Sequence, residues 1–165
     1  MKPWMHAVTY QTTWFITVLL GNIWSLLWAI PLITSIVFRQ SFQTTSFVLL
    51  VAVLGYSVDV SLQSLGFIQF HNNTAVGPVW LFILWVGFAN VIWHLMYKIP
   101  FIWLRALLGA ISGPLSYYSG ALLGAADPMT TQGVVAFAVW WAFGFPAFVA
   151  LRLHWPRWWN QLTTG

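Results

Sequence analysis

The sequence predicts an all-α fold, a polytopic bundle of transmembrane helices. Of its 165 residues, 60% are hydrophobic and only 5% are charged, whereas about a quarter of the residues in a soluble domain are charged. A helix needs roughly 20 apolar residues to cross the hydrocarbon core of a bilayer. Four stretches meet this length, which places residues 1–165 in a single integral membrane domain: 45–69, 78–97, 101–125 and 133–153.

The first 38 residues form either one kinked span or two short spans, 4–20 and 23–38. Glycine and asparagine are common where helices end, so the Gly21-Asn22 pair favours two helices, with Asn22 capping the second. Lys2 precedes a long aromatic run that has no small-residue cleavage site, so we expect this end to remain as a membrane helix.

The basic residues favour six spans over five. Cytoplasmic loops of membrane proteins carry an excess of lysine and arginine. With five spans, Lys2 lies on the opposite side from the other basic residues, and in both topologies the C-terminus is cytoplasmic. With six spans, the loop at 71–77 and Asp127 face the other side, and these basic residues are all cytoplasmic: Lys2, Arg39, Lys98, Arg105, Arg152 and Arg157.

Asp59 is the first candidate for chemistry, because it lies near the middle of an apolar segment. An acidic side chain at a helix centre costs about 2.5–3.5 kcal/mol on insertion scales. We therefore expect Asp59 to face the bundle interior, where it is either a proton acceptor or hydrogen-bond donor, or a polar residue that only joins two helices.

Tyr117 and His94 are the other candidate catalytic residues. Tyr117 falls about 6 Å beyond the centre of its helix, at a depth comparable with Asp59, so we expect the two to share a pocket. His94 falls roughly 10 Å on the cytoplasmic side of its helix centre, with Asn90 one turn earlier. A buried histidine that bonds to a neighbour is the alternative for His94.

A stripe of small residues in 107–126 predicts close helix packing, because such residues let backbones approach. Pro114 predicts a bend in the same helix. We expect Gly120 and Gly124 to meet a facing helix. The stripe consists of Gly109, Gly113, Ser112, Ser116, Gly120 and Gly124.

Several function classes are excluded by the composition. Cysteine is absent, which removes disulfides, thiolate catalysis and Cys-ligated metals. The sequence has no zinc signature, no phosphate-binding glycine loop and no serine nucleophile elbow. One aspartate in the spans excludes a paired-carboxylate site. The net charge of +4 concerns loop orientation, and we expect no metal, no cofactor and no nucleic-acid partner.

Three segments together resemble a family of small bacterial inner-membrane proteins catalogued as domain of unknown function 2878. The family pattern has Asn and Ser on either side of its histidine, where this chain has Trp93 and Leu95. The resemblance implies a multi-pass helical protein of the inner membrane without an established activity, in the company of lipid-modifying enzymes. The matching segments are LGYSVDVSLQSLGFIQF (54–70), PVWLFILWVGFANVIWHLM (78–96) and LLGAISGPLSYYSGALLGA (107–125).

Three functions remain open. The leading one is a membrane protein with an intramembrane polar site at Asp59 and Tyr117, linked to fatty-acyl or phospholipid modification, with a lipid as substrate and lipid-modifying membrane enzymes as partners. The second is a non-catalytic partner that docks through the Gly/Ser stripe. The third is a small proton-coupled carrier, for which an internal repeat is missing. A lateral opening at the depth of Asp59 favours the first, and a stripe facing lipid favours the second.

Overall fold

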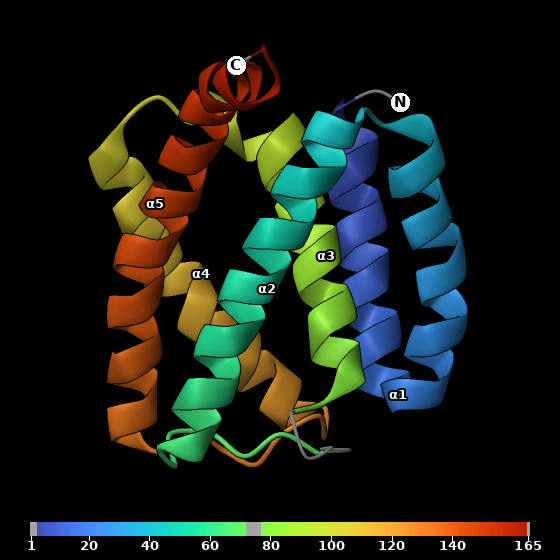
Figure 1. The fold of residues 1–165 in the computed structure, drawn as a ribbon. Helices are drawn as coiled ribbons and strands as arrows, with labels where there is room; N and C mark the ends of the chain where they lie inside the picture. The colour runs from blue at the N-terminus through green and yellow to red at the C-terminus, as the bar shows by residue number, and fades with distance from the viewer. Residues whose placement is uncertain (1–2, 72–76, 165) are drawn as a thin grey trace.

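The computed structural model describes residues 3–71 and 77–164. These residues form six α-helices and one short 3-10 helix, so the predicted all-α fold is confirmed. The start of α1 and the end of α5 lie at the same end of an upright bundle (Figure 1). The elements are α1 (Pro3–Arg39), which holds two of the six helices, α2 (Phe42–Ser64), α3 (Val79–His94), η1 (Met96–Lys98), α4 (Ile102–Leu122) and α5 (Thr131–Thr164).

The two halves of α1 form an antiparallel helical hairpin (Figure 1). Gly21 has a φ of 67° and a ψ of −160°, a left-handed conformation that glycine adopts without steric cost. The indole N–H of Trp28 donates to the hydroxyl of Thr13 at 2.8 Å and joins the two halves. The predicted helix break at Gly21 is therefore confirmed, while the side chain of Asn22 lies outside the described part of the chain.

Two helical segments are long and apolar enough to cross a membrane, namely Phe42–Ser64 and Thr131–Gln161. Two further apolar segments, Ile23–Leu32 and α3, are shorter. Large hydrophobic side chains cover the outside of the bundle, as a lipid-facing surface requires. Examples from α1, α2, α4 and α5 are Ile23, Phe42, Ile102, Leu122 and Phe143. The number of membrane crossings stays a prediction.

The helices end at different residues from the predicted segments. Helix α2 ends at Ser64 rather than at residue 69, because Gly66 takes a left-handed φ of 79°. The N–H of Phe67 then bonds to the carbonyl of Leu62 at 3.0 Å, as in a glycine-terminated helix. Helix α4 ends at Leu122 before another left-handed glycine, and α5 continues well beyond residue 153.

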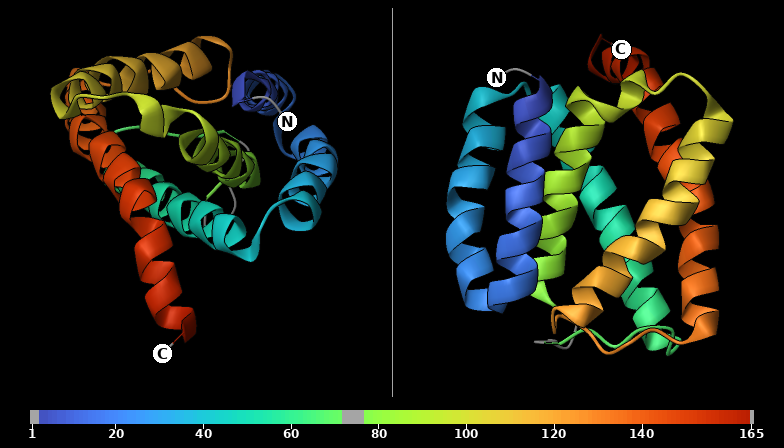
Figure 2. Two further views of the ribbon diagram at one scale, coloured as in Figure 1. Left: turned by 90° about the horizontal axis from the view of Figure 1, so that it is seen from above. Right: turned by 180° about the vertical axis from the view of Figure 1, so that it is seen from behind.

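Helix α3 is the centre of the fold. It packs against α1 and α2, while α4 packs along α5. Seen from above, α3 lies inside the ring of the other helices (Figure 2). Its Trp85 stacks on Trp141 of α5, with ring centroids 5.3 Å apart and an interplanar angle of 7°. This stack joins α3, which packs on α1 and α2, to the pair formed by α4 and α5.

The glycine stripe of α4 divides into two parts. A Cβ atom at Gly109 would overlap the backbone carbonyl of Trp141, and one at Gly113 would overlap its indole ring, so both residues permit the close approach of α4 and α5. Gly120 and Gly124 meet no atom within 4 Å. The expectation that they face another helix is therefore wrong: Gly120 lies beside open space, and Gly124 follows the helix end with a φ of 85°.

Candidate functional site

Asp59 is fully buried and joins three helices. Its Oδ2 atom accepts a hydrogen bond from the indole Nε1 of Trp85 on α3 at 2.7 Å. The same oxygen accepts a second hydrogen bond from the hydroxyl of Tyr117 on α4 at 2.5 Å. Its other oxygen, Oδ1, is buried without a hydrogen-bond partner among the described residues. The structure thus brings Asp59 and Tyr117 together.

Local packing explains why these side chains meet. Gly55 lies one helical turn before Asp59, and a Cβ atom there would overlap the ring of Trp85. The missing side chain lets the indole lie flat on α2, with its N–H at the carboxylate. Tyr117 is held on the other side by Phe137 of α5, whose ring centroid is 4.2 Å away.

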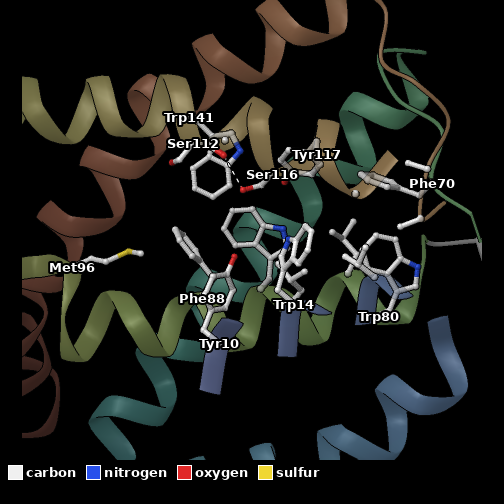
Figure 3. A pocket seen from close by; sticks show the side chains of 18 residues that line it. Tyr10, Trp14, Phe70, Trp80, Phe88, Met96, Ser112, Ser116, Tyr117 and Trp141 are labelled. Atoms are coloured by element: carbon white, nitrogen blue, oxygen red, sulfur yellow. Dashed lines mark hydrogen bonds between the residues drawn. The ribbon is translucent and has the colours of Figure 1, made fainter. Parts of the chain in front are cut away.

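A cavity of about 180 Å³ lies beside this hydrogen-bonded group (Figure 3). Tyr117 and Trp85 form part of its wall, whereas Asp59 lies behind them and does not line it. Asp59 therefore orients Tyr117 and makes no contact with the cavity. Other lining residues come from α1, α3, α4 and α5, among them Tyr10, Trp14, Phe88, Ser116 and Trp141.

The serines of the stripe also lie at this cavity. Ser112 and Ser116 line it, and their hydroxyls donate to carbonyls of their own helix, those of Leu108 at 2.6 Å and Ser112 at 2.8 Å. Because each hydroxyl donates its hydrogen bond to the backbone, its oxygen can act only as an acceptor toward the cavity.

A second hollow, of about 420 Å³, lies between the first half of α1 and α4. We call it the α1–α4 cleft. It shares Tyr10, Trp14 and Ser116 with the cavity, so the two hollows meet at these side chains. The residues that belong to the cleft alone are Gln11, Phe15, Leu115, Ser119 and Leu123.

His94 lies apart from Asp59, near the end of the bundle that holds the chain termini. Its ring stacks on that of His6, with centroids 3.8 Å apart and an interplanar angle of 7°. The amide nitrogen of Asn90 is 3.0 Å from Nδ1 of His6, and Gln40 donates to the amide oxygen of Asn90 at 2.9 Å. Within the described residues, no three side chains of the His, Cys, Asp and Glu types are grouped to hold a metal ion.

Sequence reasoning missed Trp85, Tyr10 and Trp14. Trp85 had one available signal, since a buried indole N–H needs an acceptor and Asp59 lies in the neighbouring apolar segment. Tyr10 and Trp14 are four residues apart and so share a helix face. Nothing in their spacing indicates which helix that face meets.

An ion pair lies at the end of the bundle opposite the chain termini. Nε2 of His71 lies 2.8 Å from a carboxylate oxygen of Asp127, and Nδ1 lies 2.8 Å from the carbonyl oxygen of Gly124. Both nitrogens face acceptors, an arrangement that only the doubly protonated imidazole satisfies. The hydrogen bond that His71 donates to Asp127, and secondly the one that it donates to the carbonyl of Gly124, raise the pKa of His71 above its usual value.

We expect the pKa of His71 to fall when Asp127 is replaced by asparagine. A raised pKa in the folded state means that the ion pair stabilises the protein at low pH. This stabilisation is lost as the pH rises through the pKa of folded His71. The measurement is an NMR titration of the His71 ring in the wild type and in Asp127→Asn. Equal pKa values in the two proteins would contradict the assigned cause.

The fold and the site define a small helical protein with an apolar exterior and a buried carboxylate behind an internal cavity. The chain belongs to the family described as protein of unknown function (DUF2878), whose model matches residues 3–147. No curated protein and no solved structure matches the chain.

Proposed function

We propose that this chain is a multi-pass protein of the bacterial inner membrane that binds a lipid in its internal cavity, as a component of fatty-acyl or phospholipid modification. Its apolar exterior and its two long apolar helices support the membrane location. Lys98 lies in η1, Arg105 in the first turn of α4, and Arg152 and Arg157 in the C-terminal part of α5. The start of α4 and the end of α5 lie at the end of the bundle that holds the chain termini (Figure 1). This end is then cytoplasmic.

The observation that carries the proposal is the placement of Tyr117. Its hydroxyl donates to the fully buried carboxylate of Asp59, and the residue also lines the cavity. A tyrosine hydroxyl that donates its hydrogen bond to a carboxylate keeps oxygen lone pairs that can accept another hydrogen bond. Tyr117 is thus one of the residues that contact the bound molecule, and Asp59 is a positioning residue that either holds this orientation or takes up a proton.

The small-residue stripe gives less support to a docking function. Trp141 of the same chain fills the space beside Gly109 and Gly113. The cavity is lined by Ser112, Ser116 and Gly120. Apart from Gly124, the stripe therefore contacts α5 or lines the cavity, which favours lipid binding over docking.

The test fills the cavity without disturbing the packing. In Gly120→Leu, the new side chain enters open space. We expect this variant to fold. Its affinity for the lipid probe should fall at least about tenfold, which equals about 1.4 kcal/mol. The probe is palmitic acid bearing a diazirine, in vesicles of phosphatidylethanolamine and phosphatidylglycerol, with the labelled residues mapped by mass spectrometry.

The control is Val135→Leu, which adds bulk at a position of α5 that is 57% exposed. The probe should label the cavity residues of this variant as strongly as those of the wild type. Equal labelling of cavity residues in Gly120→Leu and the wild type would refute lipid binding in the cavity.

A further inference from the structure

Resting on the proposed function, we infer that the bound molecule is a neutral, chain-shaped lipid with a carbonyl oxygen, and that it enters sideways through the α1–α4 cleft. Four features of the cavity carry this inference: its shape, its lack of charge, its unpaired hydrogen-bond donors and its junction with the cleft.

The lining of the cavity extends along the length of α3. Its lining residues run along the bundle from Trp80, near the start of α3, to Met96, just beyond its end (Figure 3). The helical part of this stretch, from Trp80 to His94, measures roughly 21 Å at about 1.5 Å per residue. A cavity of about 180 Å³ with such a lining suits part of a single alkyl chain and is too small for a bulky head group.

The described residues that line the cavity include no lysine, arginine, histidine, aspartate or glutamate. A phosphate group would therefore enter a site of low polarity without a counter-charge, which is strongly unfavourable. The charge of the lining selects a neutral molecule.

Two hydrogen-bond donors at the cavity have no acceptor. The hydroxyl of Tyr10 points into the cavity and makes no hydrogen bond to the other side chains drawn (Figure 3). The indole N–H of Trp141 is buried and makes no hydrogen bond of ordinary geometry among the described residues, although the Tyr117 hydroxyl lies near it. A buried donor such as this indole N–H is costly to leave unsatisfied. The carbonyl oxygen of an ester or a protonated carboxyl group supplies an acceptor for it and for the Tyr10 hydroxyl.

The cleft offers the route. Helix α1 packs on α3, and α4 packs on α5, so no extensive interface closes the space between α1 and α4. Figure 2 shows the two helices diverging toward the end that holds the chain termini. Phe15 is 47% exposed and Leu115 is 58% exposed at this cleft. Their apolar side chains face the surroundings from which a lipid would come.

The first experiment compares three diazirine-bearing probes with the same chain: methyl palmitate, palmityl phosphate and hexadecane. We expect methyl palmitate to label cavity residues about tenfold more strongly than the other two. Tyr10→Phe should reduce this preference while keeping the labelling by hexadecane. Equal or stronger labelling by palmityl phosphate would overturn the assigned class of ligand.

The second experiment tests the route and uses the absence of cysteine in the native chain. Phe15→Cys and Leu115→Cys are combined and bridged by a bifunctional methanethiosulfonate, with the bridge verified by mass spectrometry. Bridging should slow the labelling of the cavity by methyl palmitate at least about tenfold, and reduction should restore it. The two single-cysteine variants, treated with the same reagent, are the controls.

The outcomes separate this inference from the proposed function. Unchanged labelling rates in the bridged protein would overturn the lateral route, although Gly120→Leu would still block binding. If Gly120→Leu leaves the labelling by every probe unchanged, the cavity is not the binding site, and the proposed function fails with the inference.

Discussion

Replacing Asp59 by leucine is expected to destabilise the folded protein by about 2–6 kcal/mol, because a buried donor left without its acceptor costs about 1–3 kcal/mol. The variant leaves two such donors, the indole N–H of Trp85 and the hydroxyl of Tyr117. Because these groups belong to α3 and α4, the loss weakens the contact of α2 with both helices. The measurement is the thermal unfolding midpoint in detergent, which should fall clearly below that of the wild type.

The matched control is Asp59→Asn. Its amide oxygen can accept both hydrogen bonds, and its NH₂ group replaces Oδ1, which has no partner among the described residues. We expect the asparagine variant to fold. Lipidomics of a strain carrying it then separates two roles: a normal profile indicates that Asp59 only positions Tyr117, and the profile of a deletion strain indicates that it takes up a proton. Wild-type stability of Asp59→Leu would contradict the structural role.

Gly109→Leu is the second substitution for which we expect a large effect. The new Cβ would overlap the backbone carbonyl of Trp141, which cannot rotate away as a side chain can. Helices α4 and α5 must then separate, and overpacking of this kind costs typically 1–3 kcal/mol and occasionally more. The yield of monodisperse protein in detergent should fall sharply.

Gly120→Leu is the control for this effect, since it places the same side chain on the same helix. Here the added group meets open space, and leucine favours the helical state by about 0.5–1 kcal/mol over glycine. Its yield should match or exceed that of the wild type. Equal losses in the two variants would show that the α4–α5 contact is looser than described.

The helical class and the break at Gly21 could be predicted because they depend on short-range patterns. Segment length, composition and a glycine suited to a left-handed φ are all visible in the sequence. The proximity of Asp59 and Tyr117 followed from depth, because the rise per residue is constant along a helix. Depth alone does not identify Trp85 as the second partner, since that contact depends on how α3 is rotated.

The cavity could not be predicted, because it depends on the relative tilt of helices that are distant in sequence. The spacing of Gly109, Gly113 and Gly120 puts all three near one side of α4, which suggested a single packing surface. In the structure, α5 covers the first two and leaves Gly120 beside the cavity. A period of four residues specifies a face, and the angle between two helices decides how far along that face they stay in contact.

The hairpin at Gly21 has a consequence for biogenesis. Its two arms are joined by the hydrogen bond from Trp28 to Thr13, and the Thr13 hydroxyl also donates to the carbonyl of Thr9 at 2.7 Å. The pair therefore satisfies this buried hydroxyl before α3 has been synthesised. If the bundle spans the bilayer as proposed, the translocon can release α1 as a preassembled unit, against which the later helices dock.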